Sequence, residues 1–197
     1  ALKSPADFKA KIISNTLEGL ELDINGKTIW FRMIGAFNAY NLLAVLGVTV
    51  LLGEEEDEVL RELSGIRGAK GRFDRISIAG ITAIVDYAHT PDALDNVLKT
   101  INGVRTGGEQ LITVVGCGGN RDKTKRPVMA KIAVQESDKA ILTSDNPRFE
   151  EPEEILKDMQ AGVGPSEIRK TLSIVDRREA IKTACMLSQK GDIILIA

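Results

Sequence analysis

Two apolar runs in the middle of the sequence, residues 111–115 and 140–143, each end in polar side chains that could bind a charged small molecule. The polar residues that follow are Arg121 after the first run and Asp145, Asn146 and Arg148 after the second. Ligands of open parallel sheets bind outside the carboxyl ends of the strands. We therefore expect these four side chains to line one pocket.

Arg121 and Arg148 suit an anionic ligand, because the planar guanidinium group donates two parallel hydrogen bonds to a carboxylate. Pro147 fixes the backbone between Asn146 and Arg148 and would aim both side chains. The other cations of this segment, which are Lys123, Lys125 and Arg126, are expected to form a solvated face. The residues by themselves predict carboxylate recognition without naming the ligand.

A third strand end, at Asp86, is a candidate for nucleotide contacts. An acid at the end of a strand in an α/β unit can accept a hydrogen bond from a ribose hydroxyl. His89, the only histidine, lies between this strand end and a helix start, where side chains meet ligands, although a lone histidine is more often a structural group. No metal site is expected, because one histidine and no paired cysteines cannot supply a ligand set.

A helix is expected over residues 36–52, with two asparagines in its first turns. Asn38 is expected to cap this helix, and Asn41 is a candidate to offer its amide to a nucleobase edge. The residues Gly26-Lys27-Thr28 match the end of a phosphate-binding loop, but Glu21 stands where that motif requires glycine, and no helical pattern follows. We therefore expect a hairpin turn there instead.

The composition excludes several classes of protein. The chain has 197 residues, 43% of them hydrophobic, and its net charge of -2 with a pI near 5.6 argues against nucleic acid as a partner. No apolar run approaches the about 20 residues that a membrane span needs, and no signal segment opens the chain. With two cysteines and no disulfide framework, we expect a cytoplasmic protein. The start at Ala1 and the apolar run at residues 192–197 lead us to expect a piece of a longer protein.

The spacing of apolar residues predicts an α/β fold in two parts. Residues 10–34 are expected to form two antiparallel strands joined at Asn25-Gly26, with helices over 36–52 and 54–63 and a linker over 64–71. Beyond residue 71 the expected strands are 76–79, 81–86, 111–115, 139–143, 171–175 and 192–197, and the expected helices are 91–102, 127–136, 152–161 and 177–189. This alternation predicts a Rossmann-like, mostly parallel sheet with helices on both faces and an antiparallel hairpin at one edge.

Several segments together resemble the Mur ligases, and within them the diaminopimelate-adding MurE type. The segments that carry the likeness are Gly35-Ala-Phe-Asn-Ala-Tyr-Asn-Leu-Leu-Ala44, Gly71-Arg-Phe73, Asp86-Tyr-Ala-His-Thr-Pro-Asp-Ala93, Gly116-Cys-Gly-Gly-Asn-Arg-Asp-Lys123, Lys125-Arg-Pro127 and Asp145-Asn-Pro-Arg148. The resemblance covers nearly the whole chain in order. It implies that residues 1–71 end a central α/β ATPase domain and its linker, and that residues 72–197 form a truncated carboxyl-terminal domain.

The resemblance also implies an activity and the residues that serve it. It implies a monomeric, cytoplasmic enzyme of peptidoglycan synthesis that uses ATP and Mg²⁺ to join meso-2,6-diaminopimelate to UDP-N-acetylmuramoyl-L-alanyl-D-glutamate through an acyl phosphate. The implied nucleotide contacts are Asn41, Arg72 and Asp86, and the implied catalytic residue is His89. The implied amino-acid pocket consists of Arg121, Asp145, Asn146 and Arg148, in which Arg148 meets the second carboxylate that distinguishes diaminopimelate from lysine.

Other parts of such an enzyme are expected outside this chain. The resemblance implies that the phosphate loop, the magnesium ligands, a carbamylated lysine and the UDP-binding domain precede Ala1, and that a Gly-Lys-Gly-His-Glu segment follows Ala197. We therefore expect residues 1–197 alone not to ligate. The alternatives are a lysine-adding or folylpolyglutamate-type ligase, which the Asp-Asn-Pro-Arg segment disfavours, and a non-catalytic module that binds a nucleotide or an amino acid.

Overall fold

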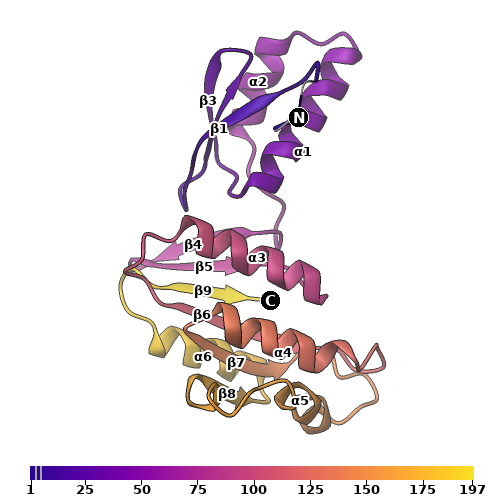
Figure 1. The fold of residues 1–197 in the computed structure, drawn as a ribbon, viewed down its shortest axis with the longest axis vertical. Helices are drawn as coiled ribbons and strands as arrows, with labels where there is room; N and C mark the ends of the chain where they lie inside the picture. Colours follow the sequence, from indigo (N-terminus) through magenta and orange to yellow (C-terminus); the bar gives the residue numbers. More distant parts are fainter. Residues whose placement is uncertain (3, 5) are drawn as a thin grey trace. The chain divides into compact units, whose positions relative to one another are not determined.

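The computed structural model describes residues 1–2, 4 and 6–197. The chain divides into two compact units, residues 1–69 with 103–105, and residues 70–102 with 106–197 (Figure 1). Each unit has its own sheet, three-stranded in the first and six-stranded in the second.

The first unit pairs an antiparallel sheet with two helices. Its elements are β1 (Ala10–Asn15), β2 (Leu20–Ile24), β3 (Lys27–Phe31), α1 (Ala36–Leu51) and α2 (Glu56–Gly65), with strand order β1-β2-β3. Alternate residues of β2, which are Leu20, Leu22 and Ile24, are buried in one core with Leu42 and Leu46 of α1. This alternation is the pattern of a sheet with one face packed on helices.

The sequence predicted two strands in residues 10–34, and the structure has three. The Asn25-Gly26 turn joins β2 to β3 as expected, with both residues at positive φ (53° and 83°) and the Gly26 amide donating to Asp23 Oδ1 over 2.8 Å. The missed turn joins β1 to β2 between Thr16 and Gly19, whose backbones bond each other over 2.9 and 3.3 Å. Its two central residues are leucine and glutamate, which carry no turn signal.

The predicted cap of α1 is wrong. The residue before the helix is Gly35 at φ 94°, and it caps without a side chain. Asn38 lies inside the first turn, and its side-chain amide donates to the Ile34 carbonyl over 2.8 Å. The helix itself ends at Leu51, one residue before the expected end.

The second unit confirms the predicted α/β fold with its mostly parallel sheet. Its strands are β4 (Asp74–Ile78), β5 (Ile81–Val85), β6 (Leu111–Cys117), β7 (Lys139–Ser144), β8 (Thr171–Ile174) and β9 (Ile193–Ile196). The strand order is β4-β5-β9-β6-β7-β8. Only β4 runs antiparallel to its neighbour, so the β4–β5 hairpin forms the predicted antiparallel edge.

Helices cover both faces of this sheet. They are α3 (Pro91–Val104), α4 (Lys125–Glu136), α5 (Pro152–Gln160) and α6 (Arg177–Leu187), with a short 3-10 helix over Ile168–Lys170. Ile112 and Val114 of β6 pack with Ala180 and Ala184 of α6 on one face. Cys117 contacts Met129 of α4, and odd-numbered residues of β6 point to the other face, so α4 lies opposite α6. Figure 1 shows α3 and α4 in front of the strands.

Two further observations complete the fold. Thr90 Oγ1 accepts a hydrogen bond from the Ala93 amide over 3.3 Å, and Pro91 begins α3, as the sequence predicted. Among the described residues, no helix is both long enough and apolar enough to cross a bilayer.

Candidate functional site

A pocket of about 640 Å³ lies in the second unit where β5, β6 and β7 end. It is lined by residues that follow these strands and by the start of α4. The predicted site residues that line it are His89, Arg121, Asp145 and Arg148. The structure therefore brings four of the eight predicted residues together at one edge of the sheet.

Asn146, the fourth residue of the predicted amino-acid pocket, is not among the lining residues. Its backbone carbonyl accepts from the Gly119 amide over 2.9 Å, and its side-chain Oδ1 is 3.4 Å from the Arg148 amide nitrogen. In this structure Asn146 shapes the loop that carries Arg148.

Arg148 is held in an uncommon conformation for a residue with a side chain, at φ 52°. Its Nη1 donates to the Gly119 carbonyl over 2.6 Å, so one end of the guanidinium is fixed by the protein. A Cβ atom added at Gly118 would lie 2.9 Å from the same Nη1. The glycine at position 118 therefore leaves room for the arginine. The charged side chains that line the pocket are those of Arg121, Lys125, Arg148, Asp122 and Asp145.

Asp86 and Arg72 lie beside each other but outside the lining of this pocket. Asp86 Oδ2 accepts from the Phe73 amide over 2.8 Å, and the Gly71 carbonyl accepts from the Tyr87 amide over 2.9 Å. The guanidinium carbon of Arg72 lies 5.0 Å from the centre of the Tyr87 ring, within the range of a cation–π contact. Residues 71–73 are thus fastened to the end of β5.

His89 is oriented by its neighbours. Its Nδ1 lies 3.1 Å from the Tyr87 carbonyl oxygen, and its ring centre lies 5.0 Å from that of Tyr87. A proton on Nδ1 would satisfy the carbonyl and make Nε2 an acceptor. The His89 carbonyl in turn accepts from Lys125 Nζ over 2.6 Å, which ties this loop to the first turn of α4.

Asn41 belongs to the first unit, on α1, and its Nδ2 donates to Asn38 Oδ1 over 3.1 Å. The two asparagines occupy neighbouring turns of one helix face, as their three-residue separation requires. The amide of Asn41 is thus oriented by Asn38, which replaces the capping role that the sequence predicted for Asn38.

Arg126, like Asn38, does not lie where the sequence predicted. It was expected on a solvated face, but its side chain is 0% exposed. The helix α4 begins at Lys125, two residues before the predicted start, and this turns Arg126 inward. Its guanidinium meets two carboxylates, those of Glu150 at 3.0 Å and Asp158 at 2.7 Å. A fully buried cation is retained only when it is paired in this way.

Glu150 is the main partner of Arg126. The hydrogen bonds from Arg126, then those from the Asn120 amide and Lys123, lower the pKa of the Glu150 carboxyl from 4.5 to about 2. The sequence offers no signal for this pairing, because the partners lie 24 residues apart and neither position belongs to a repeating pattern.

Family comparison agrees with this geometry. A family described as "Mur ligase, glutamate ligase domain" matches residues 71–197. The chain belongs to the Mur ligase family. Curated relatives named UDP-N-acetylmuramoyl-L-alanyl-D-glutamate–2,6-diaminopimelate ligase include those of Cytophaga hutchinsonii, 60% identical, and Bacteroides thetaiotaomicron, 59% identical. Both matches cover 100% of this chain but only 40% and 41% of the relatives, so the chain spans about two fifths of their length.

Solved structures give the same family. A structure of a UDP-N-acetylmuramoyl-L-alanyl-D-glutamate–2,6-diaminopimelate ligase is 37% identical, with a TM-score of 0.69, over 99% of this chain and 40% of that one. A folylpolyglutamate synthase of Thermotoga maritima aligns over 96% of this chain and 43% of its own, with a TM-score of 0.71 and 19% identity, which shows a shared fold only.

Cys117 lines the pocket of this Mur ligase domain but does not have the character of a nucleophile. Burial raises the pKa of its thiol to about 11, so the thiolate is scarce at neutral pH. Its Sγ lies 3.8 Å from Met129 Sδ, between β6 and α4. Cys117 therefore serves packing.

No metal-binding group stands out in the part of this Mur ligase chain that the structure describes. There, no cluster of three or more histidine, cysteine, aspartate or glutamate side chains could hold a metal ion. The carboxylates near the pocket are Asp145, Asp122 and Glu150, and the last two already accept hydrogen bonds from Thr124 and Arg126.

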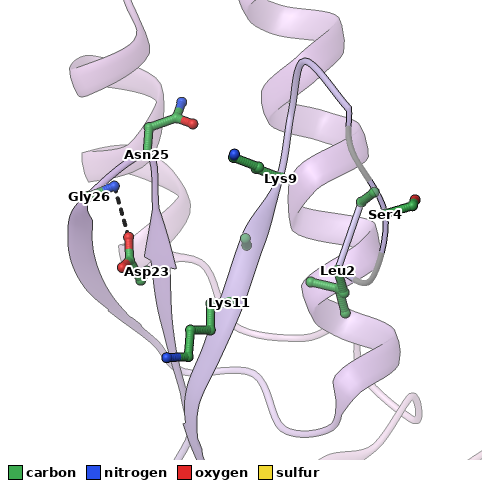
Figure 2. Close-up of a pocket in the computed structure, with 9 residues that line it drawn as sticks. Leu2, Ser4, Lys9, Lys11, Asp23, Asn25 and Gly26 are labelled. Carbon is green, nitrogen blue, oxygen red and sulfur yellow. Dashed lines mark hydrogen bonds between the residues drawn. The ribbon is translucent and has the colours of Figure 1, made fainter.

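A second hollow, of about 710 Å³, lies in the first unit of the Mur ligase chain (Figure 2). Its lining includes Lys9, Lys11, Asp23 and Asn25, none of which the sequence singled out as a site residue. Asp23 points toward Gly26 and accepts a hydrogen bond from its amide. The polar groups drawn there do not converge on one point, and we assign no ligand to this hollow.

Proposed function

We propose that this chain is the carboxyl-terminal part of an ATP-dependent ligase that joins meso-2,6-diaminopimelate to UDP-N-acetylmuramoyl-L-alanyl-D-glutamate. Such an enzyme would act in the cytoplasm, in the synthesis of peptidoglycan precursors. The names of the relatives that are 58–60% identical over the whole chain support the assignment. The observation that carries it is the pocket that contains Arg121, Arg148 and Asp145 at the strand ends.

The charges of this pocket complement those of diaminopimelate. That amino acid has two carboxylates and two amino groups, whereas lysine has one carboxylate. Arg121 and Arg148 would each pair with one carboxylate, and Asp145 would accept from an ammonium group. A lysine ligand would leave one arginine without its partner, which is how such a site would discriminate against it.

Each unit contains its own candidate contacts for a nucleotide. Asp86 would accept from a ribose hydroxyl, Arg72 would pair with phosphate oxygens, and Asn41 would meet the adenine edge. Magnesium, when bound with ATP, would neutralise phosphate charge. Its ligands are proposed to belong to the part of such a ligase outside this chain, which spans about two fifths of its relatives' length.

The proposed reaction has two steps. ATP phosphorylates the glutamate carboxylate of the UDP-linked substrate, which gives an acyl phosphate and ADP. The amino group of diaminopimelate then attacks the acyl carbon, which gives the amide and releases phosphate. The pocket residues would contribute by holding the amine in line with the carbonyl. His89, with Nδ1 beside the Tyr87 carbonyl, is the candidate catalytic residue, because Nε2 could accept the proton that the attacking amine loses.

The test compares amino acids with and without the second carboxylate. In the complete ligase that contains these residues, the binding of meso-diaminopimelate and of L-lysine is measured before and after Arg148→Ala. We expect the unmutated enzyme to prefer diaminopimelate and the variant to lose about 1.5 to 3 kcal/mol of its binding, roughly 10- to 150-fold. Arg178→Ala, on the exposed side of α6, is the matched control.

Three outcomes would contradict the proposal. Equal binding of both amino acids by the unmutated protein would remove the role of Arg148. Binding without any ATP-dependent product would favour a non-catalytic module, and a preference for lysine would favour the lysine-adding relatives.

A further inference from the structure

The loops that carry Arg121 and Arg148 are held together by a buried ion pair that belongs to neither arginine. We propose that Arg126 and Glu150 are positioning residues that set the spacing of the two pocket arginines and thereby the selectivity for an amino acid with two carboxylates. This inference rests on the proposed function and extends it to residues that do not line the pocket.

Both terminal nitrogens of the Arg126 guanidinium are fully hydrogen-bonded within the protein. Nη1 contacts Glu150 Oε2 at 3.0 Å and Asp158 Oδ2 at 2.7 Å. Nη2 donates to Glu150 Oε1 over 3.0 Å and to the Gly118 carbonyl over 3.3 Å. Of the three guanidinium nitrogens of Arg126, Nε has no partner among the described residues. The charge of Arg126 is thus neutralised inside the protein, and the side chain has no hydrogen available on its terminal nitrogens for a ligand.

These bonds fix the loop that precedes Arg121. Arg126 holds the Gly118 carbonyl, and Glu150 accepts from the Asn120 amide. Between them, the Gly119 amide and carbonyl are bonded to Asn146 and Arg148. Three consecutive residues are therefore fixed directly before Arg121, two of them by the ion pair.

The ion pair of Arg126 and Glu150 also holds the loop after β7. Glu150 lies two residues after Arg148, and the Phe149 amide donates to Asn120 Oδ1 over 3.0 Å. Gly119 lies so close to Pro147 that an added Cβ would overlap the Pro147 carbonyl. The two loops thus meet in backbone contact, and their separation is set by Arg126 and Glu150 together.

Selectivity follows from this separation. A ligand with two carboxylates is matched only when the two guanidinium groups of Arg121 and Arg148 stand at the right distance, and small displacements of positioned groups have large effects on binding and rate. The nucleotide residues Arg72 and Asp86 are fastened to each other instead, through residues 71–73 and 86–87. Disturbing the ion pair should therefore affect the amino acid and spare ATP.

The experiment uses the complete ligase with Glu150→Gln and, separately, Arg126→Lys. Glutamine keeps an oxygen for the Asn120 amide but removes the charge that faces Arg126, whereas lysine keeps the positive charge but cannot bond both Glu150 oxygens. We expect each variant to raise the KM for diaminopimelate roughly tenfold, with the KM for ATP unchanged. We also expect the preference for diaminopimelate over lysine to shrink by a similar factor.

The matched control is Asp158→Asn. Asp158 binds the same Nη1 of Arg126, but it lies on α5 and belongs to neither loop. The same change of charge there should leave the KM for diaminopimelate unchanged. A second control, Glu179→Gln, removes a glutamate from an exposed ion pair on α6.

The outcomes separate this inference from the proposed function. An unmutated ligase that does not use diaminopimelate overturns the proposed function, and this inference with it. A normal unmutated enzyme whose Glu150→Gln and Arg126→Lys variants change neither the KM for diaminopimelate nor the preference over lysine overturns this inference alone. An equal rise in the KM for diaminopimelate in Asp158→Asn also overturns this inference. So does an equal rise in the KM for ATP in Glu150→Gln and Arg126→Lys, because either result would indicate a general effect on stability.

Discussion

Burying the guanidinium of Arg126 costs free energy that its two carboxylate partners offset. Breaking such a group by removing one member is strongly destabilising, because the remaining charges lose their partner. Here the partners are only partly buried, with Glu150 15% and Asp158 41% exposed, so water can hydrate what remains. The cost should therefore fall at the lower end of the usual range.

We accordingly expect Arg126→Met to lower the free energy of unfolding of the second unit by about 3 kcal/mol. Urea unfolding followed by circular dichroism measures this. Arg178→Met, at an exposed position of α6, should change stability by less than about 0.5 kcal/mol. A variant as stable as the unmutated chain would mean that the ion group contributes no net stability.

Glu150 should also make stability depend on pH. Its pKa of about 2 in the folded chain lies below the 4.5 expected on unfolding, so the unfolded chain binds more protons between these values. The contribution is therefore fully present above about pH 4.5 and is lost as the pH falls toward 2. Glu109, whose pKa is also lowered to about 2 by hydrogen bonds from Thr106, adds to the same trend.

The measurement is a series of thermal melts between pH 6 and pH 2.5. We expect Glu150→Gln to lose melting temperature less steeply on acidification than the unmutated chain, because glutamine does not titrate. The difference between the two profiles isolates Glu150 from Glu109. Parallel profiles would show that the Glu150 carboxyl is not stabilised by its neighbours.

The site residues that the sequence predicted correctly are those that follow a strand of the parallel sheet. Arg121, Asp145 and Arg148 follow apolar strands directly, so the parallel sheet brings them to one edge. Arg126 could not be placed, because its burial depends on where α4 begins and on partners 24 and 32 residues away. Asn38 was misplaced because a glycine at positive φ provides the cap.

At the scale of elements, the contact between the two pocket loops depends on Gly119. Any side chain there would overlap the Pro147 backbone carbonyl, which cannot move as a flexible side chain can. We expect Gly119→Ala to destabilise the second unit by about 2 kcal/mol and to weaken diaminopimelate binding in the complete ligase. Gly108→Ala is the control, since an added Cβ there meets nothing within 4 Å. Chemical denaturation measures the free energy of unfolding of both variants. Equal values for Gly119→Ala and Gly108→Ala would contradict the close contact.

Helix α1 presents an outward apolar stripe. Its exposed large apolar residues, at helical spacing, are Phe37, Tyr40, Val45, Val48 and Leu51. Val48 is 58% and Leu51 80% exposed, and exposed apolar side chains promote association. We expect Val48→Gln with Leu51→Gln to reduce self-association of the 197-residue chain, as measured by sedimentation velocity, with little change in melting temperature.

The control for this prediction replaces polar residues on the neighbouring helix. Glu58→Gln with Arg61→Gln removes an exposed ion pair of α2, and it should leave self-association as it was. Unchanged association in the α1 variant would show that the stripe does not mediate contacts between copies of the chain.

The elements with strong local signals were predicted closely. The strands β6 and β7 are continuous apolar runs, as expected of strands that are buried on both faces, and α3 begins at a threonine cap followed by proline. The turn between β1 and β2 was missed because leucine and glutamate occupy it. Tertiary packing of Leu20 and Leu22 on α1, which no local pattern reveals, completes that sheet.

At the scale of the whole chain, each unit has a hydrophobic core of its own. In the first unit, Leu20, Phe31 and Leu46 belong to one cluster of buried residues. In the second, Ile112 and Ile141 pack with the alanines of α6. Separate cores allow separate unfolding, because two-state behaviour is a property of a single cooperative core.

We therefore expect two unfolding transitions in denaturant. Trp30 is the only tryptophan and lies in β3, so its fluorescence reports on the first unit alone, whereas circular dichroism reports on both. Leu46→Ala should lower the free energy of unfolding of the transition seen by fluorescence by about 2 to 5 kcal/mol and leave the second transition in place. Ile141→Ala should leave the fluorescence transition in place and lower the free energy of unfolding of the second transition instead. If either substitution shifts both signals equally, the two units unfold as one cooperative body, and stability measured on this chain would then belong to the pair of units together.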